Sequence, residues 1–140
     1  PYLSGTLAYA ESIVDFSFRT SIRARNLVTG LRFARARHPT RTILLTGVDE
    51  TFFYAAIYHD AFRLAGVFDV YLAPDANNVR QRPDRAPIDR FVMPADDALR
   101  ATLRGTVAVY DASGMRLRNQ TSLYRRSAPA RLEALAAAEP

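Results

Sequence analysis

Three polar residues, Asp49, Glu50 and Thr51, follow a short apolar segment that ends at Gly47. Ligands of α/β proteins bind where a strand ends and the next helix begins, so these three are candidate ligand-binding residues. A structural role suits the same position, because Asp49 can cap the helix by accepting hydrogen bonds from backbone N–H groups two or three residues on. Glu50 then adds a favourable negative charge at the positive helix end. We expect capping to be the main role of Asp49.

Nucleotide and metal chemistry have little support in the sequence. Asp49 and Glu50 place two negative charges where a pyrophosphate would sit. No second or third glycine follows Gly47, so neither the dinucleotide fingerprint nor the P-loop is present. The chain has no cysteine, and His38 and His59 lack the spacing of metal ligands. The sequence therefore predicts no cofactor and no metal site, and it names no catalytic residue.

The net charge of +5 comes from 19 basic residues, all of them arginine, against 14 acids. Arginine and alanine without lysine are typical of a GC-rich genome, so part of this charge is a codon effect. The arginines are spread along the chain and no known nucleic-acid-binding module is present. The sequence therefore argues against a nucleic acid as the partner.

The sharpest charge asymmetry lies between Asp15 and Asp49, where the chain has seven arginines and no acid. A solvated helix face and a surface for an anionic partner, either lipid or glycan, both account for this pattern. Six of these residues form the candidate surface for such a partner, called the arginine patch below: Arg19, Arg23, Arg25, Arg32, Arg35 and Arg37.

A β-α-β unit is predicted to position the candidate residues. Ile43 to Leu45 are consecutive apolar residues, the pattern of a strand covered on both faces in a parallel sheet. A helix from Phe52 to Leu64 is apolar on nearly every side, so we expect it to be mostly buried. Gly66 ends this helix, and a second strand spans Asp69 to Ala73.

The segments that flank this unit differ in character. A helix is predicted from about Glu11 to Arg37, with a possible break near Thr20 or Gly30, and the His38-Pro39 pair ends it. Residues 1–9 show no periodicity and are expected to form a tail or linker. Residues 74–90 contain three prolines and few large apolar residues, which predicts a long, mobile surface loop.

The C-terminal third repeats the alternation of strand and helix. A short strand is predicted from Phe91 to Met93, and then a helix that opens at Pro94 and closes at Gly105. Thr106 to Ala112 is strongly β-forming, and the alternation of apolar and charged residues from Met115 to Arg118 predicts its antiparallel partner. Residues 128–140 are expected to be an alanine-rich helix that frays.

The predicted fold is therefore a single α/β domain over residues 1–140, a small three-layer domain with a mainly parallel sheet and a C-terminal antiparallel hairpin. At 140 residues the chain can bury a core without disulfides. It starts at Pro1, so we expect an excised or processed piece. No apolar run approaches the roughly 20 residues of a membrane helix, so we expect this piece itself to be soluble.

The run LVTGLRFARARHP, the strand TILLTG and the acidic turn into an aromatic helix, VDETFFYAA, follow one another in this chain. This order resembles the soluble segment after the last membrane helix in bacterial multi-spanning glycosyltransferase-like proteins, relatives of the protein mannosyltransferases. The resemblance covers about Ile22 to Ala73. The chain has one aspartate, Asp49, where related runs often carry more acids.

The resemblance implies an α/β domain outside the cytoplasm, whose parent holds its catalytic carboxylates in loops between membrane helices. The chain would then be a periplasmic accessory domain of a polytopic membrane protein, and its partner would be the membrane-embedded part of its own chain. Two alternatives stay open. One is a stand-alone α/β enzyme with a site at the Gly47–Thr51 turn. The other is an interaction module that binds anionic lipid or polymer through the arginine-rich first helix.

Overall fold

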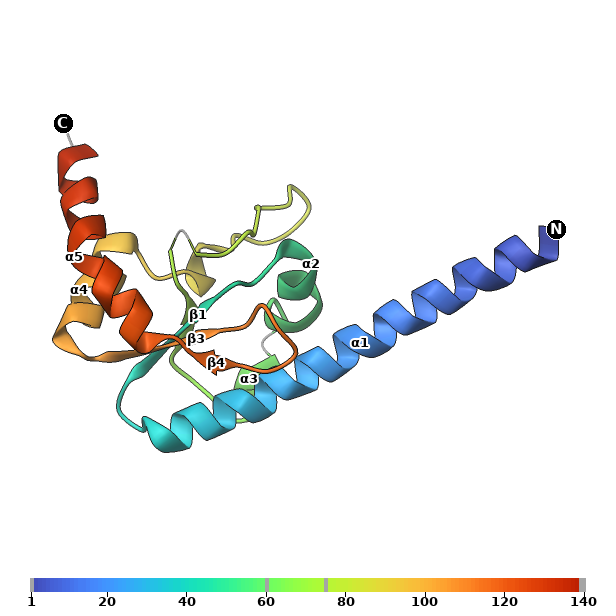
Figure 1. Ribbon diagram of the computed structural model, residues 1–140, viewed down its shortest axis with the longest axis horizontal. Coiled ribbons are helices and arrows are strands. Elements are labelled where there is room, and N and C mark those ends of the chain that lie inside the picture. Colours follow the sequence, from blue (N-terminus) through green and yellow to red (C-terminus); the bar gives the residue numbers. More distant parts are fainter. Residues whose placement is uncertain (1, 60, 75, 139–140) are drawn as a thin grey trace.

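The computed structural model describes residues 2–59, 61–74 and 76–138. Its centre is a four-stranded sheet in the order β2-β1-β3-β4, with three parallel strands and β4 antiparallel to β3. The prediction of an α/β domain with a mainly parallel sheet and a C-terminal antiparallel hairpin is confirmed (Figure 1). The strands are β1 (Thr42–Thr46), β2 (Val70–Leu72), β3 (Val107–Asp111) and β4 (Arg118–Asn119).

Two hydrophobic cores lie on opposite faces of the sheet, because successive side chains of a strand point to opposite faces. Ile43 and Leu45 belong to one core and Leu44 to the other, and all three are almost completely buried. Helices cover both faces, which gives the three layers expected from the sequence. The second core is covered by α4 (Ala95–Arg104) and α5 (Thr121–Ala138).

Helix α1 (Tyr2–Arg37) has 36 residues and is therefore about 54 Å long. Its end at Arg37 agrees with the prediction, but its start does not, because the segment expected to be a tail is helical from Tyr2 and the helix is unbroken at Thr20 and Gly30. The C-terminal half packs on the first core through Leu27, Leu31 and Ala34, and the N-terminal half projects past the body (Figure 1). Periodicity reports a face that packs on a core, and the predicted start at about Glu11 therefore left out the first residues of this helix.

The single helix predicted from Phe52 to Leu64 is three short pieces: α2 (Glu50–Phe52), the π-helix η1 (Phe53–Ile57) and α3 (Ala61–Leu64). The Tyr58 N–H donates to the Phe53 carbonyl at 2.9 Å, five residues back, which defines the π-turn. Most of η1 is buried, as expected, but Leu64 is 86% exposed. The wider turn and the break after it rotate the last residues away from the face that a regular helix would bury.

Two further predictions are wrong: the strand after β2 and the start of the C-terminal helix. The strand expected from Phe91 to Met93 is instead the 3-10 helix η2 (Asp89–Phe91), and Val92 makes only an isolated parallel bridge to Leu72. Helix α4 ends as predicted at Gly105, whose backbone is left-handed with φ 74°. The C-terminal helix begins earlier than expected, at Thr121, and residues 139–140 lie outside the described residues.

The loop of residues 74–90 is held by polar anchors. The Asn77 side chain accepts from the Val48 N–H at 2.8 Å and donates to the carbonyls of Leu45 and Ala73 at 3.0 and 2.8 Å. Further along, the Tyr54 hydroxyl donates to the Arg80 carbonyl at 3.0 Å. These side-chain bonds replace the apolar anchors that the loop lacks, and they weigh against the mobility expected from composition.

We predict that Gly47→Ala destabilises the protein more than Gly66→Ala does. Both glycines have a positive φ, of 72° and 85°, so either alanine costs about 1 kcal/mol of backbone strain. A Cβ at Gly47 would also collide with the Asp111 carboxylate and lie 2.8 Å from the Ser113 Cβ, whereas nothing lies within 4 Å at Gly66. In urea unfolding, Gly47→Ala should lower the free energy of unfolding by at least about 1 kcal/mol more than Gly66→Ala does. Equal losses would contradict the close approach at Gly47.

Candidate functional site

The turn after β1 is built around Asp49, which caps the helix as predicted. One carboxylate oxygen accepts from the Phe52 N–H at 2.7 Å. The other lies 3.4 Å from the guanidinium of Arg23 on α1, in an ion pair whose Asp49 side chain is 55% exposed. The Asp49 backbone forms a parallel bridge to Asn78. Both oxygens of the carboxylate therefore have structural partners.

Arg23 links α1 to the carboxyl end of the sheet. Its guanidinium donates to the Ala112 carbonyl at 2.6 Å, pairs with Asp49, and lies over the Phe52 ring with 3.8 Å between the guanidinium carbon and the ring centroid. The side chain is 17% exposed. Charge-assisted hydrogen bonds and cation–π contacts are stronger where water is excluded. One residue of the arginine patch thus holds together α1, the turn after β1 and the turn after β3.

The carboxyl ends of β1 and β3 form the crevice at which doubly wound sheets usually bind ligands. The chain leaves β1 towards β2 on one side and returns past β1 to β3 on the other, so the two loops diverge here. In this protein the Asp111 side chain lies at the crevice, accepting from the Ser113 hydroxyl at 2.6 Å and from the Thr46 hydroxyl at 3.4 Å. Sequence reasoning missed Asp111, although its position at the end of the strand TVAVYD was a usable signal.

The three predicted site residues lie together at the mouth of this crevice. Glu50 is 3.8 Å from Arg82 of the 74–90 loop, with both side chains more than a third exposed. Thr51 is exposed and lines a hollow of about 190 Å³ with Arg23 and Phe52. Each acid therefore has an arginine beside it. Within the described ranges, no three His, Asp or Glu side chains are close enough together to hold a metal ion.

The remaining members of the arginine patch do not form one surface. Arg35 donates to the carbonyls of Arg41 and Phe68 at 2.5 and 2.6 Å, so it fastens the C-terminal end of α1 to the body. Arg32 is exposed and reaches the Ala65 carbonyl at 3.4 Å. The buried stripe of α1 consists of Leu27, Leu31 and Ala34. Helical spacing places three arginines on one side of this stripe and three on the other: Arg25, Arg32 and Arg35, and Arg19, Arg23 and Arg37. Two of the six, Arg23 and Arg35, serve the attachment of the helix.

His38 lies just beyond α1 and shares a hydrogen bond of 3.1 Å between its Nε2 and the Tyr110 hydroxyl. Burial lowers the pKa of His38 below its ordinary value of 6.5, and the positive charges of Arg41, Arg37 and Arg35 lower it further. The imidazole is therefore kept neutral near neutral pH. The ring is bonded to Tyr110, the penultimate residue of β3.

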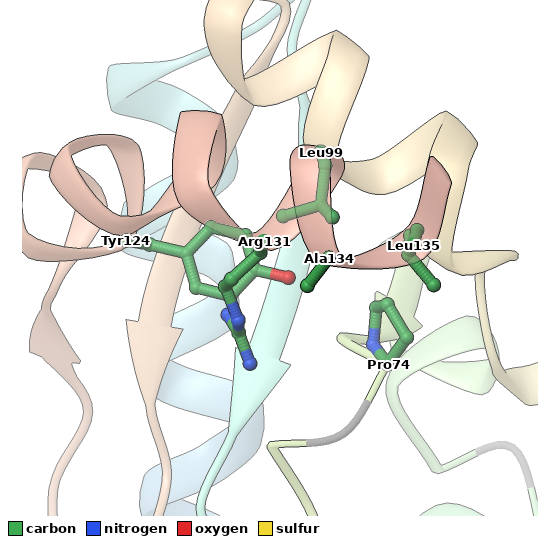
Figure 2. A pocket seen from close by; sticks show the side chains of 6 residues that line it. All are labelled: Pro74, Leu99, Tyr124, Arg131, Ala134 and Leu135. Atoms are coloured by element: carbon green, nitrogen blue, oxygen red, sulfur yellow. The ribbon is translucent and has the colours of Figure 1, made fainter. Parts of the chain in front are cut away.

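A separate hollow of about 200 Å³ lies between α5, α4 and the start of the 74–90 loop (Figure 2). Figure 2 shows Leu99, Leu135 and Pro74 around it, with the Arg131 side chain beside Tyr124. The Arg131 guanidinium carbon is 5.1 Å from the centroid of the Tyr124 ring. The lining is mainly apolar, and the hollow is smaller than the range of about 300–1,000 Å³ that is usual for ligand pockets.

Comparison with protein-family models, with curated proteins and with solved structures gives no match to this chain. Among the helices of the described residues, none combines the length and the apolar character needed to span a membrane.

We predict that Asp49→Ala lowers the free energy of unfolding by about 1 kcal/mol, because it removes the cap of α2. Asp49→Asn keeps an oxygen that accepts from the Phe52 N–H and loses only a half-exposed ion pair, so it should be nearly neutral. Urea unfolding of the two variants checks the order. If Asp49→Asn left the melting temperature unchanged but abolished the activity of the intact protein, a cap would not be a sufficient account of Asp49.

We predict that stability falls as the pH drops through 6.5, the ordinary pKa of histidine. As the pH falls, the unfolded chain binds a proton at His38 before the folded protein does, so the free energy of unfolding decreases. The decrease levels off below the lowered pKa of the folded protein. His38→Gln should flatten this dependence. His59→Gln, which removes an exposed imidazole, is the matched control. An unchanged slope in His38→Gln would contradict the assignment.

Proposed function

We propose that this chain is an accessory domain of a polytopic membrane protein of glycosyltransferase type, lies outside the cytoplasm and carries no catalytic centre of its own. The family resemblance of residues 22–73 suggests the parent. The observation that supports an accessory role best is the Arg23 junction, because it fixes a long projecting helix to the carboxyl end of the sheet.

The junction fastens α1, called the arm below, to the body of the domain. Arg23 holds it at the carboxyl end of the sheet, Arg35 holds it at the opposite end, and Leu27 and Leu31 are buried between them. The projecting half then continues past the carboxyl end, on the side of the turn after β1 (Figure 1). In the proposed assembly this arm joins the membrane-embedded part, and the loops at the carboxyl end face that part.

The state of the crevice supports the absence of catalysis. Asp49 is bonded to the Phe52 N–H and to Arg23, while Asp111 is bonded to Ser113 and Thr46. A catalytic carboxylate needs an oxygen directed at the substrate, and these oxygens are directed at the protein. The stand-alone enzyme is therefore the less supported alternative. The interaction module is also less supported, because the arginine patch is divided between two sides of α1.

We predict that Arg23→Gln loosens the arm. The change removes two charge-assisted contacts and the cation–π contact, so it should lower the free energy of unfolding by about 2 kcal/mol. Hydrogen exchange followed by mass spectrometry should show faster exchange of amides in residues 20–34. Arg25→Gln, on the same helix but exposed, is the matched control and should leave exchange unchanged. Equal protection in Arg23→Gln and the wild type would contradict the junction.

The function itself is tested in the intact parent protein in its own host. Location is read with Ala36→Cys, an exposed position in a domain that has no cysteine, in a parent whose other cysteines are replaced by serine. A membrane-impermeant maleimide should label it in cells whose inner membrane is intact. Glycosyl transfer by the parent should survive Asp49→Asn and fall with Arg23→Gln. Labelling only after lysis, or loss of transfer in Asp49→Asn alone, would overturn the proposal.

A further inference from the structure

A groove of about 450 Å³ runs between α1 and the hairpin formed by β3 and β4. It is larger than the hollows described above and lies within the range of about 300–1,000 Å³ that is usual for ligand pockets. One wall comes from α1, with Phe33 and Arg37, and the other from the hairpin, with Tyr110, Arg116 and Leu117. The groove is separate from the crevice at Asp49.

The groove is preformed, because the hairpin is fastened to α1 beside it. The Asn26 side chain donates to the Met115 carbonyl at 2.8 Å. One turn further, Gly30 lets Leu117 approach so closely that an added Cβ would lie 2.9 Å from the Leu117 Cδ1. These two contacts set the distance between the walls. A ligand would therefore meet walls that need little rearrangement.

The lining combines apolar surface with uncompensated positive charge. Phe33 is 73% exposed, which is an unusually large exposure for an apolar ring. It lines the groove together with the buried Tyr110 and the half-buried Leu117. Arg37 and Arg116 are exposed, and neither makes a hydrogen bond or ion pair within the described part of the chain. No acidic residue lines the groove.

We propose that this groove binds one molecule of an amphipathic anion, with a phosphate or carboxylate head between Arg37 and Arg116 and an apolar tail along Phe33 and Leu117. Guanidinium groups bind such oxyanions through paired hydrogen bonds, and the apolar walls supply the area for the tail. The occupant is a single free amphiphile and not a bilayer surface. A bilayer would call for cations on one open face, and the arginine patch is divided. This site does not depend on the proposed function.

The test is isothermal titration of this chain with dodecyl phosphate below its micelle concentration. Binding should saturate at one molecule per chain, and Arg37→Gln with Arg116→Gln should weaken it at least about tenfold, since charged hydrogen bonds are lost. Arg25→Gln with Arg100→Gln removes the same charge from exposed positions outside the groove and should leave affinity unchanged. Phe33→Ala should weaken the binding of dodecyl phosphate and leave any binding of inorganic phosphate unchanged.

His38 provides a second readout, because its ring is bonded to Tyr110 and senses the charges of Arg35, Arg37 and Arg41. An anion beside Arg37 offsets part of this field, so the pKa of His38, followed by NMR, should rise towards its ordinary value when dodecyl phosphate binds. The proposal fails if the variant with Arg37→Gln and Arg116→Gln binds dodecyl phosphate as tightly as the wild type. It also fails if dodecyl maltoside or inorganic phosphate binds as tightly as dodecyl phosphate, or if only anionic vesicles bind.

Discussion

The guanidinium of Arg23 is the contact through which the long helix and the sheet are joined at the carboxyl end. It forms an ion pair with the capping carboxylate of Asp49, lies over the ring of Phe52 and donates a hydrogen bond to the Ala112 carbonyl. A partly buried arginine is costly unless its donors find acceptors, and here the turns after β1 and β3 supply partners for its terminal nitrogens, while its buried Nε makes no hydrogen bond within the described residues. The register of α1 on the sheet follows from this contact and from the buried Leu27 and Leu31.

The same contact narrows the usual ligand position of an α/β sheet. Arg23 lies on one side of the crevice and donates to the Ala112 carbonyl, and Asp111 lies on the other side and accepts from Ser113 and Thr46. A shallow hollow of about 390 Å³ lies beside them, lined by Gly47, Asp49 and Asn77 among others. Gly47 has to be glycine in this arrangement, because the chain passes directly against Asp111 with a left-handed backbone. Polar residues that could bind a ligand in this crevice here stabilise the turn.

Charge that is free to act on another molecule lies elsewhere on α1. Arg23 and Arg35 are bonded within the fold, whereas Arg37 faces a groove that also holds Arg116 and no acid. A positively charged groove with an exposed aromatic ring attracts an anion and leaves apolar surface for it to cover. The functional difference among these arginines is therefore a matter of what each one contacts, and it cannot be read from their spacing along the helix.

The sequence alone determined most of the succession of strands and helices along the chain, because the buried run Ile43–Leu45, the β-rich run Thr106–Ala112 and the glycine stop at Gly105 are local signals. The order of the strands in the sheet came only from the structure. The sequence also identified Asp49 as a helix cap, since a cap depends on residues only three positions apart. The fully helical α1 and the short strand that was expected at Phe91–Met93 were misjudged, because the N-terminal half of α1 projects past the sheet and the latter segment makes only an isolated bridge to β2.

Only the tertiary structure decided how the polar residues are used. Arg23 and Asp49 are 26 residues apart and Arg23 and Ala112 are 89 apart, so no local pattern could pair them. The π-turn at Phe53–Ile57 and the exposure of Leu64 also depend on how the segment packs against the sheet and not on periodicity. Local sequence fixes which residues favour a strand, a helix or a turn. The long-range packing fixes which charges are satisfied and which remain available, because that depends on contacts between segments distant in the chain.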